Sequence, residues 1–79
     1  MADNIEKQIE ELTNLINATG RDDELYYRRG KLYWKMGKRA ESLTDFNTAI
    51  AINPESPASE YLKMLNDIMD FYNTDLYNP

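Results

Sequence analysis

The sequence predicts an all-α fold in which four helices form an antiparallel stack of helical hairpins. Apolar residues recur at intervals of three and four in four separate segments, which is the spacing of an amphipathic helix. No stretch alternates apolar and polar residues for long enough to indicate a β-strand. Short turns separate the four segments, and short turns force neighbouring helices to run antiparallel. Residues 1–79 are therefore interpreted as one small domain.

The first helix is predicted over residues 4–18. Asp3 or Asn4 is expected to cap its start, and Thr19-Gly20 is expected to end it. Glu, Lys, Gln and Asn residues lie between the apolar positions, so one side of this helix is predicted to face a core. The apolar positions are Ile5, Ile9, Leu12, Leu15 and Ile16.

The second helix is predicted over residues 23–36, closed by Gly37, and the third over residues 39–52, stopped by Asn53-Pro54. Acidic residues at the start of the second helix cap it and complement its dipole, an interpretation favoured over a metal-binding role. These acidic residues are Asp22, Asp23 and Glu24. The apolar positions of the third helix are Leu43, Phe46, Ala49 and Ile50.

The fourth helix is predicted over residues 57–72 as a capping helix, because Pro57 suits a first helical turn. Its apolar positions are Tyr61, Leu62, Leu65, Ile68, Met69 and Tyr72. Residues 73–79 are predicted to form a polar tail. Two residues of this tail are apolar, Leu76 and Tyr77. We expect the tail to fold back onto the fourth helix or toward Trp34; the alternative is that it docks into a second molecule and gives a homodimer.

The chain contains an internal repeat. When the sequence is shifted by 34 residues, residues 9–20 lie over residues 43–54. The apolar positions and the helix stops then coincide, pairing Ile9 with Leu43, Leu12 with Phe46, Leu15 with Ala49, Ile16 with Ile50 and Gly20 with Pro54. A 34-residue period of paired helices is typical of tetratricopeptide repeats.

Residues 23–56 resemble one tetratricopeptide repeat, which implies a fragment of an α–α superhelix. The positions that match the family pattern are Tyr26, Gly30, Tyr33, Gly37, Ser42, Phe46, Ala49 and Pro54. Small residues at Gly30 and Ser42 allow two helix backbones to approach, and Ala49 lets the next helix come close. Tyr33 and Phe46 are expected to fill the space between the paired helices.

Two positions depart from the family pattern. Arg29 stands where leucine is usual, so either its stem packs while its guanidinium reaches solvent, or the contact is lost. Ser42 replaces the more usual alanine. Residues 4–18 resemble the second helix of a partial repeat, and residues 57–72 resemble the first helix of a following one. The domain therefore corresponds to about one and a half to two repeats.

A binding face is predicted on the second helix. Residues 26–39 hold six of the nine basic residues and four of the nine aromatic ones, in a chain whose net charge is −5. Tyr26, Gly30 and Tyr33 are expected to point into the hairpin. The resemblance implies that the opposite side lines a concave groove for partner peptides, formed by Tyr27, Lys31, Trp34 and Lys35 with Arg28 at the rim. The alternative is that Trp34 packs on a neighbouring helix or on the tail, with solvated lysines.

Composition excludes several function classes. The chain has no Cys and no His, which removes Cys-ligated metal sites and most hydrolytic mechanisms, so we expect a non-catalytic protein with no cofactor and no bound metal. The amino-terminal segment lacks the basic and apolar regions of a secretory signal, and no apolar run is long enough to span a membrane. The expected compartment is the cytoplasm.

The resemblance implies a scaffold or adaptor that binds a protein or peptide segment through the face of helix 23–36. A carboxylate clamp for acidic C-termini is rejected, because only Lys31 and Lys35 could serve in it. Self-association, with the groove filled by the chain's own tail or by a second subunit, is the alternative. Binding of single-stranded nucleic acid through the basic and aromatic residues is the remaining alternative. It is disfavoured, and no nucleic acid is expected as a partner, because acidic residues such as Asp45 and Glu41 on the adjoining helix would repel phosphate.

Overall fold

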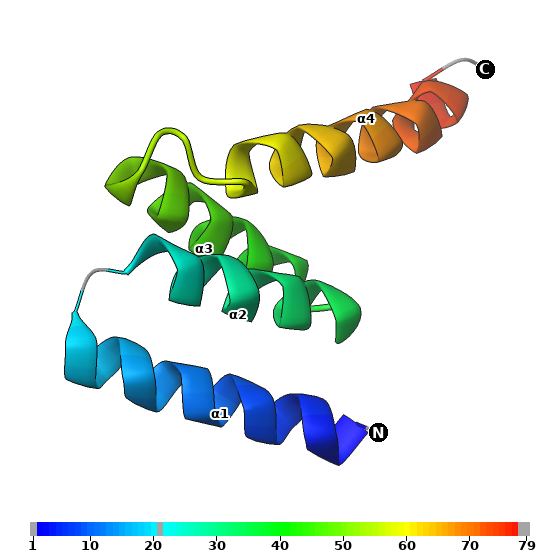
Figure 1. The fold of residues 1–79 in the computed structure, drawn as a ribbon. Helices are drawn as coiled ribbons and strands as arrows, with labels where there is room; N and C mark the ends of the chain where they lie inside the picture. Colours follow the sequence, from blue (N-terminus) through cyan, green and yellow to red (C-terminus); the bar gives the residue numbers. More distant parts are fainter. Residues whose placement is uncertain (1, 21, 78–79) are drawn as a thin grey trace.

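The computed structural model describes the backbone of residues 2–20 and 22–77, and side chains over residues 4–20 and 22–67. Within these residues the chain forms four helices and no strand: α1 (Ala2–Thr19), α2 (Asp23–Lys35), α3 (Arg39–Ile52) and α4 (Ala58–Tyr77) (Figure 1). Each helix packs mainly on its neighbours in the chain, and α2 and α3 lie at the centre. The all-α prediction and its antiparallel hairpins are confirmed.

The central helices match their predicted bounds closely, whereas the outer two are longer. The helix α1 begins at Ala2, so Asp3 and Asn4 lie inside its first turn and do not precede it as caps. The helix α4 continues to Tyr77, through residues predicted to be a tail. Because residues 73–77 extend the helix, they do not fold back onto it, and the end of α4 leads away from α1 and α2 (Figure 1). The side chains of Leu76 and Tyr77 lie outside the described residues.

Glycines end the first two helices. Gly20 and Gly37 have φ angles of 88° and 80°, a left-handed conformation that side chains with a Cβ rarely adopt. After α2, the amide of Gly37 donates to the carbonyl of Trp34 at 3.0 Å, and the amide of Lys38 donates to the carbonyl of Tyr33 at 2.9 Å. These two bonds form a Schellman motif, which satisfies carbonyls at the end of the helix and turns the chain sharply toward α3.

Side-chain caps set the starts of α2 and α4. The carboxylate of Asp22 accepts a hydrogen bond from the amide of Glu24 at 3.0 Å, as the prediction of an acidic cap requires. The hydroxyl of Ser56, almost fully buried, accepts one from the amide of Ala58 at 3.1 Å. The side-chain amide of Asn53 donates to the carboxylate of Asp23 at 3.3 Å, which ties the turn after α3 to the start of α2.

The core lies where α2, α3 and α4 meet. Phe46, Ala49 and Ala58 are completely buried, and Leu65 is 2% exposed. Half-buried side chains surround this cluster, namely Tyr26, Tyr27, Trp34, Ile50, Tyr61 and Leu62. The ring of Phe46 lies 6.1 Å from that of Tyr27 and 5.2 Å from that of Tyr61, between centroids, in tilted arrangements that favour aromatic contact.

The closest approach of α2 and α3 occurs at Gly30. A Cβ atom added there would lie 2.8 Å from Cε1 of Phe46 and 3.2 Å from Cβ of Asp45. On the same contact, the hydroxyl of Ser42, completely buried, donates to the carbonyl of Gly30 at 2.7 Å. Two residues of the predicted repeat pattern are therefore required by packing, and the serine that replaces alanine adds a hydrogen bond between the helices.

Replacing Gly30 by alanine is expected to lower the free energy of unfolding by about 1–2 kcal/mol, because overpacking outweighs the better helix propensity of alanine. The ring of Phe46 cannot move aside without disturbing a fully buried cluster. Urea unfolding followed by circular dichroism measures the change. In a Phe46→Leu background the same substitution should cost less; stabilisation of the native sequence by Gly30→Ala would contradict the close contact.

Candidate peptide-binding groove

A groove of about 710 Å³ lies between α1 and α2, and one residue of α4 also lines it. Its lining consists of Gln8, Glu11, Leu12, Arg28, Lys31, Leu32, Lys35 and Tyr61. Leu12 and Leu32 contribute apolar atoms to the lining, and both helices also contribute polar side chains. This mixture of an apolar surface with a few charged groups is typical of a site that binds a ligand or a peptide.

The groove is positively charged, although the chain as a whole is acidic. Arg28 is paired with Glu24 at 2.7 Å, an exposed pair one helical turn apart. The ammonium of Lys31 lies 4.5 Å from the centre of the Tyr27 ring, within range of a cation–π contact. Within residues 4–20 and 22–67, no carboxylate lies within ion-pair distance of Lys31 or Lys35. Two ammonium groups one turn apart therefore remain available to an anionic partner.

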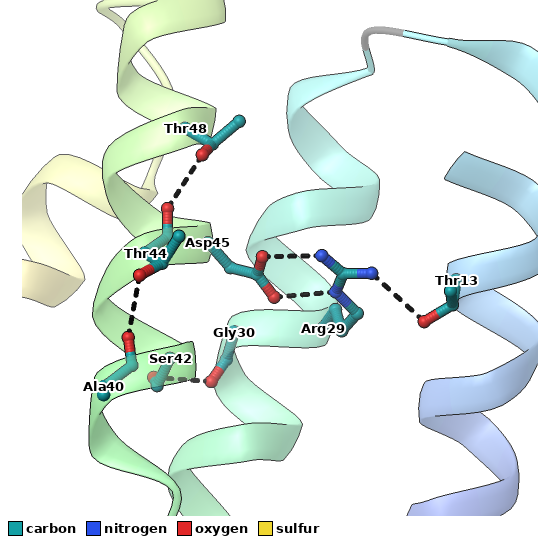
Figure 2. Close-up of polar contacts among 8 residues, drawn as sticks. All are labelled: Thr13, Arg29, Gly30, Ala40, Ser42, Thr44, Asp45 and Thr48. Carbon is teal, nitrogen blue, oxygen red and sulfur yellow. Dashed lines mark hydrogen bonds and ion pairs between the residues drawn. The ribbon is translucent and has the colours of Figure 1, made fainter. Parts of the chain in front are cut away.

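A buried ion pair involves Arg29, the residue that follows groove residue Arg28 in α2. The guanidinium of Arg29 donates two hydrogen bonds to the carboxylate of Asp45, both at 2.8 Å, and a third to the hydroxyl of Thr13 at 3.1 Å (Figure 2). The side chain of Arg29 is 17% exposed and that of Asp45 only 4%. Hydrogen bonding to Asp45 raises the pKa of Arg29 further, so the arginine stays charged at all ordinary pH values.

The Arg29–Asp45 pair joins three helices, because Thr13 lies in α1, Arg29 in α2 and Asp45 in α3 (Figure 2). The guanidinium also lies 5.6 Å from the ring centre of Tyr26 and 5.7 Å from that of Tyr33. Neither of the two outcomes expected for an arginine at this position occurs, since its head group is held inside the fold. Thr13 follows groove residue Leu12, so this contact helps to set the distance between α1 and α2.

A family model described as "Tetratricopeptide repeat" matches residues 24–56. The chain contains a tetratricopeptide repeat. The match runs from the second residue of α2 through α3 to the turn that follows it, in agreement with the repeat predicted over residues 23–56. Tetratricopeptide repeats are non-catalytic and generally mediate protein–protein interactions. No curated protein and no solved structure matches the chain.

Three of the five predicted binding residues of the repeat line the groove: Arg28, Lys31 and Lys35. The structure corrects the side on which Tyr27 and Trp34 lie, because both pack against the cluster around Phe46. Tyr27 is held between Phe46 and Tyr61, whose ring stands edge-on to it at 6.0 Å. Residues of α3 and α4 form the cluster on this side of α2, and a helical periodicity on α2 alone could not reveal that contact.

Trp34 is half-buried, and the guanidinium of Arg39 lies 5.5 Å from the centre of its ring. Of the two expectations for this residue, the structure favours packing over a place in the groove. The groove residues absent from the sequence prediction are Gln8, Glu11, Leu12, Leu32 and Tyr61. Of these residues, Leu12 could have been found from the sequence, because it belongs to the apolar stripe of α1 and aligns with Phe46 of the repeat.

The buried pair also changes the electrostatics of α3. Asp45 was expected to repel phosphate from the basic stretch of the repeat, yet its carboxylate is buried and paired with Arg29. Glu41, by contrast, is exposed. The helices of the described part of the chain are too short or too polar to cross a membrane.

Proposed function

We propose that the domain is an adaptor whose groove between α1 and α2 binds an acidic peptide segment of a partner protein. The observation that carries this proposal is the pair of ammonium groups on Lys31 and Lys35, which line the groove without a carboxylate partner among the described residues. Charge-assisted hydrogen bonds from such groups to carboxylates are stronger than neutral ones. An acidic segment is therefore the chemistry that the groove complements best.

The other residues of the groove and of α2 either contact the peptide or hold α2 in place. Leu12 and Leu32 offer apolar surface to a side chain of the peptide, which gives the groove a contact that survives at high salt. Arg28 stands at the edge, where its pairing with Glu24 leaves it a secondary role. Tyr27 and Trp34 do not line the groove but stabilise the position of α2, since both pack against the core. The ring of Tyr27 also lies under the ammonium of Lys31.

Selection of short random peptides displayed on phage, with the whole chain as bait, tests the proposal. We expect the recovered peptides to be rich in Asp and Glu, and their affinity to fall as salt rises. The variant Lys31→Glu/Lys35→Glu should weaken binding by at least about tenfold, the loss expected when one charge-assisted hydrogen bond is removed.

Lys38→Glu/Lys63→Glu is the matched control, because it changes the net charge by the same amount at two exposed positions outside the groove. This variant should bind the selected peptides within about twofold of the native chain. Equal weakening by both double variants would mean that overall charge, and not the groove, attracts the peptides. Recovery of peptides without acidic residues would contradict the proposal directly.

A further inference from the structure

We infer that a partner of this groove is the C-terminal half of α4, residues 68–77, from a second copy of the chain. The inference rests on the proposed function, because it assigns an occupant to the same groove. Three observations carry it: among the described residues no helix covers the groove as α2 covers its counterpart in α3, α4 extends beyond its described contacts with the core, and the two surfaces carry opposite charges.

In the internal repeat α1 corresponds to α3, but the aligned residues of α1 are less covered than those of α3. The 34-residue shift places Leu12 of α1 over Phe46 of α3, and Leu15 over Ala49. Phe46 and Ala49 are completely buried, whereas Leu12 is half-buried beside the groove and Leu15 is 48% exposed. The counterparts in α3 are covered by α2 and α4. A further amphipathic helix laid along the groove would cover Leu12 in the same manner.

The helix α4 offers a segment of the required kind. Its described core contacts come from residues 58–65, yet the helix continues to Tyr77. In the sequence of the C-terminal half, Ile68, Tyr72 and Leu76 recur every four residues, which is the apolar stripe of a helix. Figure 1 shows that this half leads away from α1 and α2, so in a continuous α4 only the N-terminal part, at Tyr61, meets the groove of its own chain and residues 68–77 do not.

The charges of the two surfaces are complementary. Residues 68–77 contain Asp70 and Asp75 and no basic residue, and at helical spacing Asp75 falls beside the apolar stripe whereas Asp70 falls on the opposite side of the helix. The groove contributes three cations and a single carboxylate, that of Glu11. Complementary charge favours this pairing over the association of two grooves or of two acidic helix ends, and it orients the copies head to tail. A head-to-tail contact leaves one free groove and one free helix end, so further copies can add.

Sedimentation velocity of the whole chain over a range of concentrations tests this inference. The weight-average mass should rise above the 9.3 kDa of one chain as concentration increases. The groove variant Lys31→Glu/Lys35→Glu and the helix-end variant Tyr72→Ser/Leu76→Ser should each raise the dissociation constant by at least about tenfold. Circular dichroism checks that both variants keep the helix content of the native chain, and Lys38→Glu/Lys63→Glu should associate as the native chain does.

A mixture of the two variants tests directly whether the groove of one copy binds the helix end of another. The groove variant retains a native helix end and the helix-end variant retains a native groove, so a one-to-one mixture has one intact junction and should stop at a heterodimer. A native chain that remains at 9.3 kDa at every concentration overturns the inference, and so does a mixture that stays monomeric. If that monomer still binds acidic peptides through Lys31 and Lys35, the proposed function stands without it.

Discussion

Replacing Phe46 by alanine is expected to cost about 3–5 kcal/mol of the free energy of unfolding, the range for removing a large aromatic side chain from a core. Phe46 is completely buried and contacts the rings of Tyr27 and Tyr61 and the backbone of Gly30. A chain of this length has a total stability of only about 4–12 kcal/mol, so this single change removes much of it. Thermal unfolding followed by circular dichroism should show a midpoint lower by at least about 12 °C.

Two control variants make the Phe46 result specific. Phe46→Leu keeps most of the buried apolar volume and should lower the midpoint much less than Phe46→Ala. Leu15→Ala removes an apolar side chain that is 48% exposed, and its effect should stay within about 0.5 kcal/mol. If Phe46→Ala melted within a few degrees of the native chain, Phe46 would not be the centre of the core.

The second large effect is expected at Asp45. The variant Asp45→Ala leaves the guanidinium of Arg29 inside the fold without its carboxylate, which should destabilise the chain by about 3 kcal/mol. This value lies at the lower end of the range for buried pairs, because Arg29 keeps 17% of its side chain exposed and retains its hydrogen bond to Thr13. Urea unfolding measures the loss.

A double-mutant cycle separates the pair from its surroundings. Arg29→Leu restores the residue that is usual in the tetratricopeptide pattern, so Arg29→Leu/Asp45→Ala should be close to the native stability even though Asp45→Ala is not. The difference between the summed single effects and the double effect gives the coupling energy. Additive losses would mean that the two residues stabilise the fold independently, against the bidentate contact seen in Figure 2.

The bounds of α2 and α3 were predictable because strong local signals flank them. Gly37 takes a left-handed conformation between the two helices, and Asn53-Pro54 follows the second. The end of α4 lacked such a signal, since Asn73, Thr74 and Asp75 only weaken a helix and do not stop it. At the other end, Asp3 stabilises a first helical turn through the dipole as well as it would cap one, so the start of α1 was ambiguous.

The candidate groove was partly predictable. The spacing of Lys31 and Lys35 places both ammonium groups on one side of α2, and this side does line the groove. The same helical spacing could not show which neighbouring helix covers Tyr27 and Trp34, because that depends on how α4 crosses α3. The pairing of Arg29 with Asp45 depends on the register between two helices, which no local pattern in either helix encodes.

The packing of each helix mainly on its chain neighbours has a consequence for how the protein acquires its structure. Short turns and local contacts keep the loop-closure entropy small, which favours rapid folding. The hairpin of α2 and α3 holds the Gly30–Phe46 contact, and we expect folding to begin there. Amide protons of this hairpin should therefore exchange with solvent most slowly, so the stretch that forms the complete repeat is also the most persistent part of the molecule.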